Sequence, residues 1–125
     1  MIKNIVFDMG GVLIVWDPVR MLNQLHLSEA DNELLNRELL RLETSLKAAG
    51  EKPIFCFLHY PPLYQGYQCP EILSLLETYK VELCCYGHLH GPVIRRRLEG
   101  KYGKTEFSLI SGDHLGFVPK KICEM

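Results

Sequence analysis

Apolar residues follow two patterns along the chain, short continuous runs and one long periodic stretch. The runs at 2–7, 54–58 and 81–85 are bounded by glycine, proline or polar residues, which is typical of buried strands. Over 28–49, leucine recurs at alternating spacings of four and three residues, which predicts a long helix with one apolar face that ends at Gly50. This face consists of Leu35, Leu39, Leu42, Leu46 and Ala49.

Two further segments have the start signals and apolar spacing of helices. Asp17 can cap a helix that has Pro18 at its first position, and Pro70 can begin another. Because this second helix joins the strands predicted at 54–58 and 81–85, the order indicates a parallel crossover.

The C-terminal region predicts an antiparallel hairpin, with strands at 93–98 and 106–110 joined by a turn that contains glycine. The basic run 95–97 would then lie on a solvated or edge strand, and 63–68 reads as a polar, tyrosine-rich loop. The predicted fold class is α/β, a partly parallel sheet flanked by helices with a C-terminal antiparallel hairpin, in a single compact domain over 1–125.

The composition limits the class of protein but does not indicate a function. The 125 residues are 47% hydrophobic and 23% charged with a net charge of −1, which is typical of one soluble domain and gives no nucleic-acid signal. Neither a secretory leader nor a membrane-spanning run is recognisable. The five cysteines are odd in number, and Cys56, Cys84 and Cys85 fall in predicted core strands, so we expect reduced thiols and a cytoplasmic location.

Three histidines stand out because each follows a predicted strand. His59 ends the run at 54–58, just before two prolines, and His88 and His90 lie between Gly87 and Gly91. A metal site can form where two strands of a sheet both carry imidazoles at the same end. His59, His88 and His90 are therefore the candidate metal ligands.

The motifs at 59–62 and 87–91 resemble the C-terminal half of the calcineurin-like metallophosphoesterases, with similarity over about 41–125. The resemblance implies a metal-dependent phosphoester hydrolase in which His59 and His88 bind one divalent metal (Zn, Mn or Fe) and His90 binds another. It also implies a phosphorylated small-molecule or other phosphoester substrate.

Three family motifs, Asp-x-His, Gly-Asp and Gly-Asn-His, belong to the N-terminal half, and none precedes His59 here. This predicts an incomplete metallophosphoesterase-like sandwich and weak or incomplete activity of the isolated chain. Since imidazoles are neutral, we expect at most one tightly bound ion. Asp8 could take the place of the missing aspartate, with Gly10 where the histidine should be.

A second resemblance lies near the N-terminus. Residues 7–13 and 16–18 resemble the first motif of the haloacid-dehalogenase-type phosphatases, and the likeness extends over about residues 1–40. It implies that Asp8 is a catalytic nucleophile that forms an aspartyl-phosphate and binds Mg²⁺. Gly10 replaces the family's usual general acid. The local pattern is equally compatible with a simple turn.

Three functions therefore remain open: a metallophosphoesterase-like hydrolase, a haloacid-dehalogenase-type phosphatase acting through Asp8, and a catalytically inactive chimeric or truncated domain. The third of these would not be an enzyme. Residues 111–114 either place further polar groups at a strand end or form a turn, and the turn is favoured. Half of a sandwich would leave a sheet face or edge exposed, which makes a homo-oligomer an open alternative.

Overall fold

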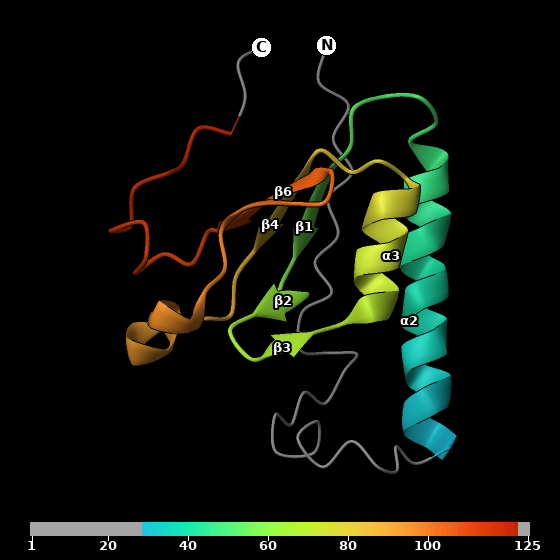
Figure 1. Cartoon of the computed structure of the whole chain (residues 1–125), viewed down its shortest axis with the longest axis horizontal. Helices are drawn as coiled ribbons and strands as arrows, with labels where there is room; N and C mark the ends of the chain where they lie inside the picture. Colours follow the sequence, from blue (N-terminus) through green and yellow to red (C-terminus); the bar gives the residue numbers. More distant parts are fainter. Residues whose placement is uncertain (1–28, 123–125) are drawn as a thin grey trace.

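The computed structural model describes residues 29–122 and has a mixed α/β fold (Figure 1). The elements in chain order are helix α2 (Glu29–Ala48), strands β1 (Phe55–Leu58), β2 (Leu63–Tyr64) and β3 (Tyr67–Gln68), helix α3 (Pro70–Thr78), strand β4 (Leu83–Tyr86), the 3₁₀ helix η1 (Gly91–Arg96), and strands β5 (Gly100–Tyr102) and β6 (Thr105–Leu109). The strand predicted at 2–7 and the helix predicted from Asp17 lie outside the described residues.

The main sheet is partly parallel, as the sequence predicts. Its strand order is β1-β4-β6-β5; β1, β4 and β6 run parallel, and β5 pairs antiparallel with β6. Leu58 pairs with Tyr86, and Tyr86 pairs with Leu109. This register brings the carboxyl ends of the three parallel strands to one edge of the sheet, where chemistry is commonly placed in α/β folds.

The core lies between this sheet and the two helices, which stand side by side in Figure 1. The predicted face is confirmed towards the end of the first helix: Leu42 and Leu46 of α2 and Ala49 just after it are buried, together with Leu76 of α3. Leu35 and Leu39 are half-buried. The hydroxyl of Tyr79 donates to Glu43 Oε1 at 2.8 Å and ties the end of α3 to α2. On the sheet, the buried core side chains are Cys56, Leu58, Cys84, Tyr86, Phe107 and Leu109.

The prediction of a strand at 93–98 is wrong, because Gly91–Arg96 forms the 3₁₀ helix η1. Pro92 fixes its own φ and has no N–H to contribute to a strand ladder, whereas it suits the first turn of a helix. The basic run therefore lies at the end of η1 and not on an edge strand. The hairpin itself is confirmed, but its first strand is β5, and Gly103, with φ +61°, occupies the turn.

The segment 63–68 is also more ordered than the predicted loop. Leu63 pairs with Gln68 and Tyr64 with Tyr67, which makes a small antiparallel hairpin turned at Gly66, where φ is +86°. The N–H of Gln65 donates to the carbonyl of Arg96 at 2.8 Å. This hydrogen bond attaches the β2–β3 hairpin to η1, so both elements border the same edge of the sheet.

Candidate functional site

The structure brings His59 and His88 together at the carboxyl ends of β1 and β4. His59 directly follows β1, and His88 follows β4 after Gly87. The N–H of Gly87 lies 3.2 Å from the carbonyl of Leu58 and 3.1 Å from that of His59. These hydrogen bonds extend the parallel pairing by one step past the strands, so the two histidines leave the sheet as neighbours.

The two imidazole rings are in contact, with centroids 5.3 Å apart and planes inclined at 61°. The ring of Tyr60 contacts both, at 4.7 Å from His59 and 4.3 Å from His88. His88 adopts φ +66°, a left-handed conformation that is uncommon for a residue with a side chain. Backbone conformations of this kind concentrate at functional sites, where the surrounding structure holds them in place.

Electrostatics favour neutral imidazole at this position. His88 is exposed as a residue, but the partial loss of water around its ring lowers its pKa, and positive charge on His59 or His90 would lower it further. Neutral imidazole is the form that binds metal ions. The packing around His88 therefore favours the protonation state that a ligand needs.

His90 occupies a different position from this pair. Its Nδ1 lies 2.9 Å from Asp113 Oδ1, and Asp113 Oδ2 accepts the N–H of Gly91 at 2.8 Å. Within residues 29–122, no ring contact joins His90 to His59 or His88. Hydrogen bonds from Gly91 and then from His90 hold the pKa of the Asp113 carboxyl below its ordinary value.

The donor set fits part of a metal site. Two imidazoles that share one tetrahedral ion at about 2 Å would have ring centroids about 5 Å apart, which agrees with the spacing of His59 and His88. Within the described part of the chain, however, no group of three His, Cys, Asp or Glu side chains is arranged to hold an ion. Asp8, the remaining candidate, lies outside that part. The joint role of the three histidines thus stays a prediction.

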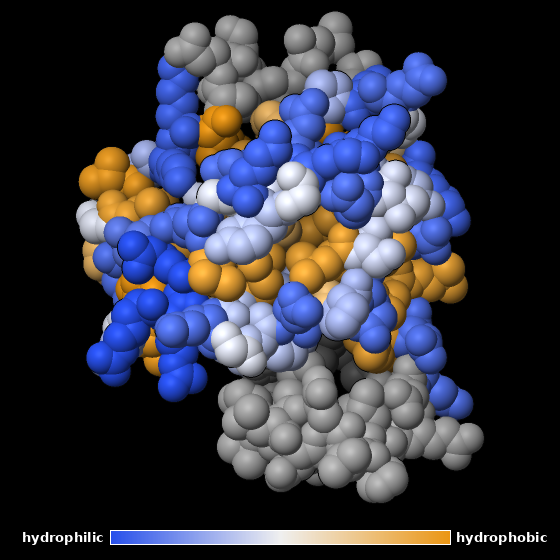
Figure 2. All heavy atoms as spheres, viewed as in Figure 1, coloured by the Kyte–Doolittle hydropathy of each residue, from blue (hydrophilic) through white to orange (hydrophobic). Residues whose placement is uncertain are grey.

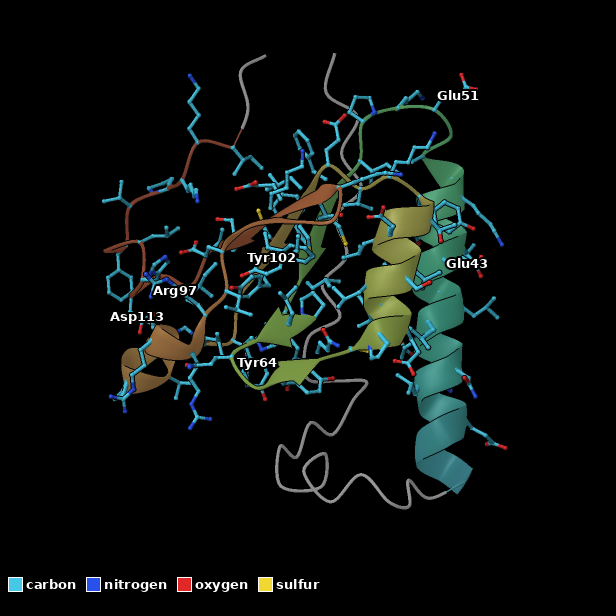
Figure 3. All side chains as sticks on the ribbon, viewed as in Figure 1. Glu43, Glu51, Tyr64, Arg97, Tyr102 and Asp113 are labelled. Carbon is cyan, nitrogen blue, oxygen red and sulfur yellow. The ribbon has the colours of Figure 1, made fainter. Side chains whose placement is uncertain are left out.

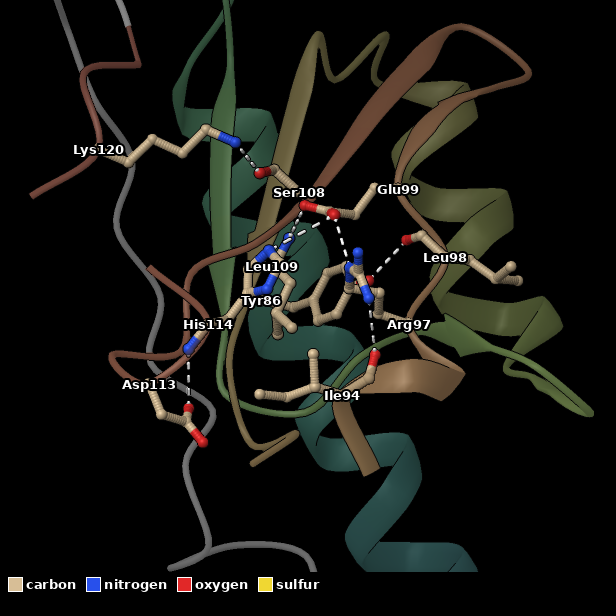
Figure 4. Close-up of polar contacts among 10 residues, drawn as sticks. All are labelled: Tyr86, Ile94, Arg97, Leu98, Glu99, Ser108, Leu109, Asp113, His114 and Lys120. Atoms are coloured by element: carbon tan, nitrogen blue, oxygen red, sulfur yellow. Dashed lines mark hydrogen bonds and ion pairs between the residues drawn. The ribbon is translucent and has the colours of Figure 1, made fainter. Parts of the chain in front are cut away.

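A second polar cluster supports the end of β6 (Figure 4). Glu99 Oε1 accepts the N–H of Leu109 at 3.1 Å, while Oε2 accepts Arg97 Nε at 2.9 Å and lies 3.5 Å from His114 Nε2. Burial alone would raise the pKa of Glu99, but the hydrogen bonds from Arg97 and Leu109 and the nearby His114 keep it below the ordinary value.

The sequence left two alternatives open for residues 111–114, and both are correct: the segment forms the favoured turn, and its Asp113 carboxylate also contacts the candidate ligand His90. The sequence reasoning missed Glu99, for which no local pattern gave a signal. Figure 3 shows Asp113 and Arg97 at the end of the molecule where η1 lies.

Comparison with known proteins decides the family. The family model for calcineurin-like phosphoesterases matches residues 2–92, nearly three-quarters of the chain, including all three candidate ligands and Asp8. The chain belongs to the calcineurin-like phosphoesterase family. No match was found among curated proteins or among solved structures.

Membership in the calcineurin-like phosphoesterase family makes the chain a metallophosphoesterase-type hydrolase in general terms. Members generally use divalent metals and act on phosphoester substrates. The match begins at residue 2, well before the boundary predicted near 41, so it covers the segment assigned to a haloacid-dehalogenase-like region. The comparisons give that second resemblance no support. Within residues 29–122, no helix combines the length and hydrophobicity needed to cross a membrane.

Proposed function

We propose that this chain is a metal-dependent phosphoester hydrolase whose site lies at the carboxyl ends of β1 and β4. The observation that carries the proposal is the contact between His59 and His88, which come from different strands and meet at a spacing suited to one shared ion. The left-handed backbone at His88 and its lowered pKa support the same assignment.

His59 and His88 would hold the ion, and His90 would contribute a further imidazole. The candidates are the metals that the family resemblance implies, Zn²⁺, Mn²⁺ and Fe; imidazole suits Zn²⁺ and Fe, and a carboxylate ligand suits Mn²⁺. A bound divalent ion supplies the means to polarise the phosphate and activate water. A carboxylate ligand would offset its positive charge, and Asp8, inside the matched range, is the candidate. With no Gly-Asp or Gly-Asn-His motif before His59, we expect weak activity from the isolated chain.

Positive charge near the site favours an anionic substrate. Arg97 is paired with Glu99, whereas Arg95 and Arg96 have no ion-pair partner in the described part of the chain. Figure 2 shows strongly hydrophilic residues gathered over the region of η1. At a rise of about 2 Å per residue along a 3₁₀ helix, the Cα atoms of Arg95 and Arg96 lie roughly 10–12 Å from that of His90. The two arginines would therefore attract a phosphoester substrate towards the site from a distance, without contacting the scissile bond.

The decisive test is hydrolysis of a chromogenic phosphomonoester and phosphodiester after chelation and re-addition of single metals. We expect Mn²⁺ or Zn²⁺ to restore activity, and we expect His88→Ala to abolish it. A loss of metal affinity in Asp8→Ala would support the carboxylate role of Asp8. Absence of hydrolysis with every metal would contradict the proposal and leave a catalytically inactive domain. Mg²⁺-dependent activity that Asp8→Asn abolishes would indicate nucleophilic catalysis by Asp8 instead.

The buried cysteines favour a reducing compartment. Cys56, Cys84 and Cys85 are free and almost fully buried, and burial raises the pKa of the Cys85 thiol to about 11. Thiols in this state are typical of proteins kept reduced. We therefore retain the cytoplasm as the proposed location, to be tested by locating the tagged chain in intact cells.

A further inference from the structure

The turn that follows β6 places the Asp113 carboxylate next to His90. Ile110 is bonded through its N–H to the carbonyl of Tyr86 at 2.8 Å, which keeps the start of this turn beside the end of β4. Internal hydrogen bonds then close it, from Leu115 N–H to the Ser111 carbonyl at 3.1 Å and from Phe117 N–H to the Gly112 carbonyl at 2.7 Å. The backbone around Asp113 is thereby fixed on both sides.

The Asp113 carboxylate is surrounded by nitrogen donors. Oδ2 accepts the N–H of Gly91 at 2.8 Å, and Oδ1 accepts the N–H of His114 at 3.0 Å and lies 2.9 Å from His90 Nδ1. An ionised carboxylate can only accept hydrogen bonds. The contact with His90 therefore requires a proton on Nδ1, which leaves the lone pair of the neutral ring on Nε2.

We infer that Asp113 is a positioning residue that fixes His90 in its Nδ1–H tautomer and leaves Nε2 as the metal-binding nitrogen. This inference rests on the proposed function, since it takes His90 as a ligand. Histidine ligands commonly donate their other N–H to a carboxylate, which orients the ring and raises its basicity. With both oxygens engaged by N–H donors, Asp113 is placed to orient a ligand and not to bind the ion itself.

Glu99 and His114 make further contacts next to the turn that carries Asp113. His114 Nε2 lies 3.5 Å from Glu99 Oε2, and Glu99 Oε1 accepts the N–H of Leu109. Glu99 is therefore hydrogen-bonded to β6 and lies beside the turn, where a protonated His114 would form an ion pair with it.

The first experiment reads the tautomer in the metal-free chain by long-range ¹H–¹⁵N NMR of the histidine rings. Above about pH 8, where imidazoles are neutral, we expect His90 to carry its proton on Nδ1. In Asp113→Asn the amide cannot accept from all three donors, so we expect a mixture of tautomers. A proton on Nε2 of His90 in the unmodified chain would overturn the inference.

The second experiment measures the affinity for Zn²⁺ alone by calorimetry. We expect a loss of roughly 10–100-fold in Asp113→Asn and Asp113→Ala, the range found for outer-shell partners of metal ligands. Glu51→Gln is the matched control, because it removes the same charge from an exposed residue on the loop after α2. Equal Zn²⁺ affinity in all three variants would contradict the role of Asp113.

Neither measurement depends on hydrolysis, which separates the two possible failures. If phosphoesters are not cleaved while the tautomer and the Zn²⁺ affinity respond to Asp113 as stated, the proposed function fails and the positioning role stands. If hydrolysis is observed but the tautomer of His90 is the same in the Asp113 variants as in the unmodified chain, the positioning role is wrong and the proposed function stands. Circular dichroism of each variant checks that the fold is retained.

Discussion

The ring of His59 lies against the ring of His88, with centroids 5.3 Å apart, although helix α3 and strand β4 come between them in the sequence. The cause is the in-register parallel pairing of β1 with β4, in which Leu58 faces Tyr86. Each histidine then follows the last paired residue closely. The proximity is therefore a property of the sheet and not of the local sequence at either histidine.

Removal of either ring should disable the site without unfolding the chain. His59 is half-buried and His88 exposed, so neither supports the core. For His59→Ala and His88→Ala we expect losses of Zn²⁺ affinity that exceed the roughly 10–100-fold typical of an outer-shell residue. Calorimetry measures the affinity, and an unchanged far-ultraviolet circular dichroism spectrum is the control. Full affinity in either variant would remove that histidine from the ligand set.

The chain should bind no more than one divalent ion tightly per monomer. Two such ions at about 3.5 Å repel by about 19 kcal/mol at an effective dielectric constant of 20, and neutral imidazoles do not offset this. Equilibrium dialysis followed by elemental analysis measures the stoichiometry. Two tightly bound ions per monomer would show that further carboxylates complete the site.

Stability should depend on the buried face of α2. Leu46 is 1% exposed, so Leu46→Ala is expected to lower the free energy of unfolding by about 2–5 kcal/mol through lost burial and a residual cavity. Leu40 is 62% exposed on the same helix, and Leu40→Ala should change stability by less than about 0.5 kcal/mol. Urea unfolding compares the two. Similar effects of both substitutions would contradict the assignment of the core face.

Glu99 should make stability sensitive to acid. Its pKa is lowered from 4.5 in the folded chain by Arg97, Leu109 and His114, against the opposing effect of burial. A lowered pKa means that the carboxylate stabilises the fold above about pH 4.5, and that this contribution is lost as the pH falls through the folded pKa. Glu99→Gln should therefore flatten the decline of the unfolding free energy below that pH. An identical decline in both proteins would exclude this role.

Arg95 and Arg96 should affect substrate binding more than turnover. At about 10 Å through water, each charge contributes about 0.4 kcal/mol to the attraction of a monoanion. The double substitution Arg95→Gln with Arg96→Gln should therefore raise KM roughly fourfold at low salt and leave kcat unchanged. The control is Lys101→Gln, which removes a positive charge from the exposed edge strand β5. A fall in kcat with constant KM would argue against an electrostatic role.

Much of the scaffold was readable from local patterns. The leucine spacing predicted α2 and its buried face, and Gly50, with φ +63°, ends that helix as expected. The short apolar runs gave β1 and β4, and Pro70 gave the start of α3. These succeed because the period of the apolar residues reflects which face of an element is buried.

The same reasoning failed where tertiary contacts outweigh local pattern. The apolar and basic residues after Pro92 predicted a strand, yet they form η1, which Pro92 favours locally and which the hydrogen bond from Gln65 of the β2–β3 hairpin to Arg96 holds in place. For Leu63–Gln68 the sequence predicts a loop, whereas the segment forms a small antiparallel hairpin. Short segments of this kind take their conformation from the neighbours that satisfy their backbone groups, and those neighbours are distant in the sequence.

The sequence by itself determined the residue types at the ends of two buried strands, because a histidine beside glycine or proline marks where a strand stops and a polar side chain emerges. Only the tertiary structure decided which of these side chains meet. Parallel register places His59 on His88, whereas the turn after β6 brings Asp113 to His90. Parallel strands are joined by long crossovers, so the residues that pair are distant in the sequence and the local pattern at each histidine does not determine which side chains meet.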